Sequence, residues 1–171
     1  MVSNKKYLLL DTCIIQDTGD KNASKSNAVL DYLKELDTYY NLAISEITIF
    51  ENLQGLWGKR ANQALKVLKT YEWKQITNKV LILSASLGGL YRTITSSNIE
   101  TGDKIIASTT ILLDAHVLTK NYEDFPSPFF NQYMWKPIPF QVGHYTRTID
   151  YIIYEPNKEI IKRMFTEKEN Q

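Results

Sequence analysis

The sequence feature that most constrains the fold is a short apolar run that ends in a carboxylate, Tyr7-Leu-Leu-Leu-Asp11. A carboxylate held against such a run costs several kcal/mol unless a partner compensates it. Continuous apolar runs of this length are typical of strands covered on both faces, as in a parallel sheet, and residues 6–10 and 13–15 fit this description. Asp11 would then lie at the carboxyl end of the first strand, and its partner must come from elsewhere in the sequence.

Helical and strand patterns alternate along the first 125 residues. Apolar spacing and N-cap residues predict helices over four ranges, which are 24–38, 46–57 after Ser45, 60–72, and Asp103 to about Leu113. Short apolar runs predict further buried strands over residues 42–44, 80–83 and 115–119. Helices that alternate with short buried strands indicate an α/β fold with a central, mostly parallel sheet.

The composition changes after Phe125. Residues 125–140 read FPSPFFNQYMWKPIPF, and their prolines exclude a regular helix. Residues 142–154 look strand-like, and Pro156 is well placed to begin a helix that runs to about residue 168. We therefore predict a core formed by residues 1–125 and a C-terminal extension, residues 126–171, that packs on this core.

Bulk properties narrow the functional classes. The chain has 171 residues and carries 20 basic and 19 acidic residues, so binding of nucleic acid would need a local basic patch. A single cysteine, Cys13, excludes an intrachain disulfide and suits a reducing compartment. No apolar stretch approaches the roughly 18 residues of a membrane span. We expect a cytoplasmic protein without membrane contacts.

Acidic and amide side chains from distant segments fall on one edge of the predicted sheet. In open parallel α/β sheets, ligands bind at the carboxyl ends of the strands, where the following helices begin. Asp11 follows the first strand, Glu51 lies in the second turn of the helix after residues 42–44, and Asp103 begins its own helix. Asn121 and Asp124 follow the strand at residues 115–119. We expect these side chains to lie close together.

Clustered carboxylates need compensation. At ~4 Å and an effective dielectric constant of ~20, each like-charged pair costs about 4 kcal/mol, so protons or a cation must be present. Oxygen ligands without His or Cys favour Mg²⁺ or Mn²⁺, which can assist hydrolysis of a phosphodiester. Each acid also has an ordinary structural reading, as a turn residue, a helix cap or a solvated helix residue. The coincidence of all of them on one edge favours a functional site.

Three segments resemble the PIN domain, the metal-dependent nuclease family that includes the VapC ribonuclease toxins of bacterial toxin–antitoxin pairs. They are LLLDTCIIQD, ISEITIFENLQG and GDKIIASTTILLDAHVLTKNYEDF, and together they cover roughly residues 6–125. The resemblance implies a PIN-like three-layer α/β/α core in which Asp11, Glu51 and Asp103 bind the metal. It also implies supporting roles for four polar residues, namely Thr12 and Ser45, which orient the carboxylates, and Thr119 and Asn121, at the exit of the last core strand.

The fourth acid and the lysines are less directly assigned. Members often carry a fourth acid near this exit, and because Asn121 cannot supply charge, we expect Asp124 to take that place. Lys104 and Lys120 lie beside the acids in sequence and could contact RNA phosphates or serve surface solubility. Aromatic residues of the extension, such as Tyr133 and Trp135, could stack on unpaired bases or pack the extension onto the core.

These features predict a Mg²⁺- or Mn²⁺-dependent endoribonuclease, the toxin of a type II toxin–antitoxin pair. The resemblance implies a homodimer and an antitoxin whose tail fills the acidic groove. Two alternatives remain open at this point, a PIN-domain nuclease outside toxin systems that acts in RNA processing or on DNA, and a non-catalytic PIN module that binds RNA or protein. A haloacid-dehalogenase-like phosphotransferase is disfavoured, because it needs an acid at position 13, where the chain has Cys13.

Overall fold

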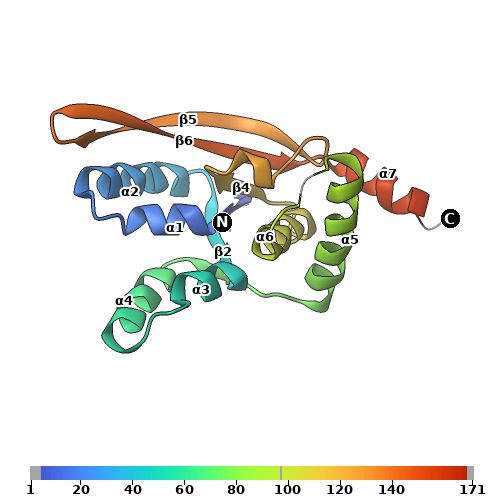
Figure 1. Ribbon diagram of the computed structural model, residues 1–171, viewed down its shortest axis with the longest axis horizontal. Coiled ribbons are helices and arrows are strands. Elements are labelled where there is room, and N and C mark those ends of the chain that lie inside the picture. Colours follow the sequence, from blue (N-terminus) through green and yellow to red (C-terminus); the bar gives the residue numbers. More distant parts are fainter. Residues whose placement is uncertain (1–4, 97, 169–171) are drawn as a thin grey trace.

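A computed structural model describes residues 5–96 and 98–168 and shows one mixed sheet between helices (Figure 1). The strand order is β3-β2-β1-β4-β6-β5. The strands are β1 (Tyr7–Leu10), β2 (Asn41–Ser45), β3 (Glu72–Lys74), β4 (His116–Thr119), β5 (Phe130–Val142) and β6 (Tyr145–Pro156). Strands β3, β2, β1 and β4 are parallel neighbours, whereas β6 runs antiparallel to both β4 and β5. The expected α/β class with a mostly parallel sheet is confirmed.

Helices cover both faces of this sheet. They are α1 (Thr12–Thr18), α2 (Ala23–Asp37), α3 (Glu46–Leu53), α4 (Gly58–Leu68), α5 (Asn78–Ile94), α6 (Thr101–Leu112), the 3₁₀ helix η1 (Tyr122–Asp124) and α7 (Lys158–Lys168). Alternate residues of β1 point to opposite faces, so Leu8 and Leu10 pack with α1 and α2, whereas Leu9 packs with α5 and α6. Burial on both faces explains why β1 is continuously apolar. Among the described residues, no helix has the length and apolar character that crossing a membrane requires.

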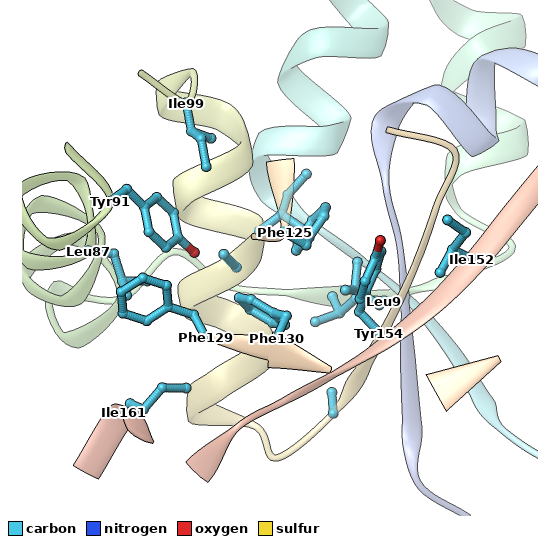
Figure 2. Close-up of a cluster of buried hydrophobic side chains, with 14 of the residues drawn as sticks. Leu9, Leu87, Tyr91, Ile99, Phe125, Phe129, Phe130, Ile152, Tyr154 and Ile161 are labelled. Atoms are coloured by element: carbon cyan, nitrogen blue, oxygen red, sulfur yellow. The ribbon is translucent and has the colours of Figure 1, made fainter. Parts of the chain in front are cut away.

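Aromatic side chains from the predicted extension complete the core on the α5–α6 side. Figure 2 shows Phe129 and Phe130 packed among side chains of α5, the loop after β4 and β6. The ring centroids of Phe129 and Tyr91 lie 4.9 Å apart, and those of Phe130 and Phe125 lie 5.3 Å apart. Because β6 also pairs with β4, strands β5 and β6 of the extension continue the central sheet and its core.

The β5–β6 hairpin runs along α2 (Figure 1). Ile138 and Tyr151 belong to the same buried cluster as Val29 and Tyr32 of α2, and the Tyr32 and Tyr151 rings are stacked with centroids 6.2 Å apart. The proline-rich segment cannot form a helix and lies instead in β5, at the edge of the sheet. Pro137 and Pro139 have no backbone N–H to donate to a further strand, and an edge strand does not need one on its outer side.

Two strand expectations are wrong. Residues 80–83 lie inside α5, where the Thr77 side chain caps the helix by accepting a hydrogen bond from the Val80 amide at 3.3 Å. Residues 13–15 lie in α1, which begins directly after Asp11. In both cases a short apolar run buried by the fold has the same composition in a helix as in a strand. Strand β3 was not anticipated, because it has only three residues.

Candidate functional site

The parallel strands bring the predicted acids to one edge of the sheet. Strand β1 lies between β2 and β4 and is parallel to both, so the carboxyl ends of all three strands meet there. Asp11 directly follows β1, and its backbone amide donates to the Leu118 carbonyl of β4 at 3.1 Å. This pairing continues the register by one residue and places Asp11 beside Thr119, the last residue of β4.

Asp11 finds its partners among neutral groups. The Asp11 residue is 2% exposed, and its Oδ2 accepts hydrogen bonds from Thr119 Oγ1 at 2.6 Å and from the Cys13 thiol at 3.1 Å. Thr119 Oγ1 in turn accepts from the Asn121 amide at 2.9 Å. Burial and the neighbouring Asp11 carboxylate raise the pKa of the Cys13 thiol, which therefore stays protonated. The hydroxyl and the thiol orient the carboxylate without cancelling its charge.

Glu51 reaches the same edge from α3. The Thr12 hydroxyl, at the start of α1, donates a hydrogen bond to Glu51 Oε2. The other oxygen, Oε1, lies against the backbone of Gly102 in the first turn of α6. Thr12 therefore contacts the Glu51 carboxylate, and its supporting role stays a prediction. The Ser45 hydroxyl is buried and makes no hydrogen bond among the described residues, so it does not orient a carboxylate in this conformation.

The predicted acids line a shared cleft of about 510 Å³. Its lining is polar and contains five acids among the described residues, namely Asp11, Glu51, Glu100, Asp103 and Asp124, together with Thr12, Cys13, Gln16, Gln54 and Asn121. Glu100, the N-cap residue of α6, was missed from the sequence. The rule that places Asp103 on this edge applies equally to the residue that precedes its helix, and this signal could have found Glu100.

The described lining of the cleft contains no lysine or arginine beside its acids. Burial, followed by the charges of Asp124, Asp11, Glu51 and Glu100, raises the pKa of Asp103 to about 8. Burial and the Asp11 charge also raise the pKa of Asp124, although a hydrogen bond from Asn121 acts in the opposite direction. This shift favours the protonated form of Asp103 near neutral pH.

The donor chemistry of the cleft suits a hard divalent cation, because carboxylate, hydroxyl and amide oxygens are the ligands that Mg²⁺ and Mn²⁺ prefer. Within residues 5–96 and 98–168, however, no three His, Cys, Asp or Glu side chains converge closely enough to form a ready metal-binding group. The acids share a cleft and repel one another, and binding an ion would require their side chains to draw together. Glu51, Asp103 and Asp124 are half-buried side chains at the cleft surface.

The two lysines expected to contact RNA lie outside the lining of the acidic cleft. Lys120 Nζ contacts both carboxylate oxygens of Asp17 at 2.9 Å. Lys104 lies over Gly88 of α5, where a β-carbon on residue 88 would meet its Cδ atom at 3.2 Å. Both side chains therefore pack against the protein in this conformation, and their contact with RNA stays a prediction.

A buried ion-pair network around Asp17 was not anticipated from the sequence. Asp17 is 3% exposed and also accepts from Lys25 Nζ at 2.6 Å and from the Tyr151 hydroxyl at 2.9 Å. Burial raises the pKa of Asp17, but the hydrogen bonds from Lys120, Lys25 and Tyr151 outweigh burial and lower it overall. The network ties α1 and α2 to β6 and to the loop that follows β4.

Comparison with known proteins identifies similar folds only. No protein-family model and no curated protein sequence matches the chain. Among solved structures, the chain is similar to VapBC2 of Rickettsia felis bound to a DNA fragment from their promoter, with a TM-score of 0.59, 22% identity and coverage of 68% of this chain and 89% of that chain. A toxin–antitoxin complex from Klebsiella pneumoniae gives a TM-score of 0.54, 23% identity and coverage of 71% and 92%. FitAcB from Neisseria gonorrhoeae gives a TM-score of 0.51, 20% identity and coverage of 69% and 90%.

These comparisons correct the family assignment made from the sequence. The similar structures are toxin–antitoxin complexes, and the similarity does not distinguish whether the matched chain is the toxin or the antitoxin. With identities of 20–23% and no matching family model, the assignment of this chain to the PIN-domain family as a VapC-type toxin is wrong as it was made. The comparisons support a shared fold.

Proposed function

We propose that this protein is a metal-dependent endoribonuclease that works as the nuclease of a type II toxin–antitoxin pair. The observation that carries the proposal is the cleft at the carboxyl ends of β1, β2 and β4, which is lined by five acids and by no lysine or arginine among the described residues. Burial, together with the charges of the neighbouring acids, raises the pKa of Asp103 to about 8 and so destabilises the folded protein near neutral pH. A site of this kind is expected where the charge serves a ligand.

Asp11, Glu51 and Asp103 would hold Mg²⁺ or Mn²⁺, with Asp124 as a further acid. The bound ion would neutralise the clustered carboxylates and stabilise the negative charge that grows on a phosphodiester during its hydrolysis. Thr119 and Thr12 hold the Asp11 and Glu51 carboxylates in place through their hydroxyls. Asp124, whose pKa is raised by burial and by Asp11, is suited to take a proton from an attacking water.

The toxin–antitoxin part of the proposal rests on the similar structures, which are complexes of this kind. An antitoxin partner would control the activity by covering the acidic cleft. Three acids of the cleft, Glu51, Asp103 and Asp124, are half-buried and so partly accessible to solvent, which is compatible with a single-stranded RNA substrate and with a covering protein segment. A homodimer of this chain remains part of the proposal.

The nuclease proposal is tested with purified protein and a labelled RNA that contains single-stranded loops. We expect cleavage with Mn²⁺ or Mg²⁺, loss of cleavage with a chelator, and a decrease of at least ~100-fold in Asp11→Asn and Asp103→Asn. The matched control is Asp31→Asn, which changes an exposed carboxylate of α2 that pairs with Lys34. Circular dichroism must show that each variant is folded.

The antitoxin proposal is tested separately by co-expression with the reading frame that lies next to the gene. We expect this product to co-purify with the chain and to suppress cleavage. Full cleavage by both Asp11→Asn and Asp103→Asn would overturn the proposed site, whereas cleavage without any inhibiting neighbour would remove only the toxin–antitoxin part.

A further inference from the structure

The Glu51 carboxylate lies in a narrow slot between two helix starts. On one side, the Thr12 hydroxyl at the start of α1 donates to Oε2. On the other side, Oε1 lies so close to Gly102 that a β-carbon on residue 102 would overlap it and would come within 3.1 Å of the carboxyl carbon Cδ. No side chain larger than hydrogen fits at position 102 while Glu51 keeps this position.

Backbone conformation does not explain a glycine at this position. Gly102 lies in the first turn of α6 and is absent from the positive-φ glycines, which are Gly55, Gly58 and Gly143. In a helix, glycine is less favourable than alanine because it loses more conformational freedom on folding. The local structure would therefore tolerate alanine, and the space taken by Glu51 is the physical reason for glycine.

We propose that Gly102 is a positioning residue, whose missing side chain lets α6 approach α3 and holds the Glu51 carboxylate toward the acids of the cleft. The inference rests on the proposed function, because Glu51 is one of its metal-binding acids. A β-carbon at position 102 would require the Glu51 carboxylate to shift, which would change its place in the cleft and its hydrogen bond with Thr12.

The test compares Gly102→Ala with Gly88→Ala, a matched glycine-to-alanine change in the neighbouring helix α5. At position 88 the three atoms nearest to the added β-carbon all belong to the flexible side chain of Lys104, with Cδ at 3.2 Å. We expect Gly102→Ala to lower Mn²⁺ affinity, measured by titration calorimetry, by about 10-fold or more, and RNA cleavage by about 10- to 100-fold. Gly88→Ala should stay within about 2-fold of the wild type in both measurements.

A second variant pair tests whether the effect passes through Glu51. Glu51→Asp shortens the side chain by one methylene and withdraws the carboxylate from the slot, which leaves room for a β-carbon at position 102. In the Glu51→Asp background, Gly102→Ala should therefore lower Mn²⁺ affinity by less than about 3-fold. Equal losses in both backgrounds would overturn the proposal, as would a Gly102→Ala protein that binds Mn²⁺ like the wild type.

Thermal unfolding of the wild type, Gly102→Ala, Glu51→Asp and the double variant gives a measurement that needs neither metal nor activity. In chelator, Gly102→Ala should raise the thermal midpoint in the Glu51→Asp background by at least ~2 °C more than in the wild type. Alanine stabilises a helix relative to glycine, and only in the Glu51→Asp background does its β-carbon avoid a clash with residue 51. Identical midpoint shifts in the two backgrounds would overturn the inference. A wild type that neither binds Mn²⁺ nor cuts RNA would instead overturn the proposed function, and the midpoint cycle would still decide the role of Gly102.

Discussion

The acid cleft should make the protein less stable as the pH rises, and Asp103→Asn should remove most of this effect. Asp103 has a pKa of about 8 in the folded protein, against an ordinary value of 3.8. Because the folded-state pKa is raised, the unfolded chain loses this proton first as the pH rises. The contribution of Asp103 to stability is fully present below pH ~4 and is lost progressively up to pH ~8.

The size of the effect follows from the two pKa values. A pKa difference of 1 corresponds to about 1.4 kcal/mol. The difference of about 4 therefore sets an upper limit of roughly 5–6 kcal/mol. Asp103 is only half-buried, so solvent screening reduces the expected effect to about 2 kcal/mol. For a chain of this length, 2 kcal/mol corresponds to about 4–8 °C in the thermal midpoint.

The assay is thermal unfolding in chelator at pH 5, 7 and 9, with Asp31→Asn as the exposed control. Asp103→Asn should be more stable than the wild type at pH 9, and the difference should shrink steadily toward pH 5. A variant that is equally stable or less stable than the wild type at pH 9 would refute the reasoning, because the acids would then not repel one another in the folded protein.

Two further changes probe the same cleft. Saturating Mn²⁺ at about 100 times its dissociation constant should raise wild-type stability by about 2.7 kcal/mol, and this gain should be absent in Asp11→Asn when both are followed by thermal unfolding. Thr12→Val, which removes the hydroxyl that donates to Glu51, should lower RNA cleavage by about 10- to 100-fold, whereas Thr12→Ser should keep most of it. Equal RNA cleavage by Thr12→Val and Thr12→Ser would show that cleavage does not need the hydrogen bond from residue 12 to Glu51.

The placement of Asp11 was predictable because two independent signals coincide in the sequence. The apolar run before Asp11 indicates a strand buried on both faces, and the parallel α/β class fixes which end of that strand holds polar groups. The structure places Asp11, Glu51, Asp103 and Asp124 around one cleft, as the same reasoning predicts. Their metal-binding and catalytic roles stay predictions.

The sequence was less informative where burial alone decides between helix and strand. Residues 80–83 are apolar in α5 as they would be in a strand, and only the Thr77 cap and the later buried residues Leu87 and Tyr91 indicate a helix. The close approach of Gly102 to Glu51 depends on how α6 and α3 pack, and no local pattern encodes that distance. The Asp17 network depends in the same way on side chains that the fold brings together from α2, β6 and the loop that follows β4.

The Asp17 network has a consequence for the charge of the cleft. Lys120 lies between Thr119 and Asn121, close in sequence to the cleft, but both carboxylate oxygens of Asp17 bind its ammonium group. Asp17→Asn should therefore have two effects. Removing the buried partner of Lys25 and Lys120 should cost about 3 kcal/mol of stability, and a released Lys120 should lower the pKa of Asp103 and compete with Mn²⁺.

Comparing Asp17→Asn with Asp17→Asn/Lys120→Met by Mn²⁺ titration separates the two effects. If the double variant binds Mn²⁺ no better than the single one, Lys120 does not reach the cleft and the network serves stability alone.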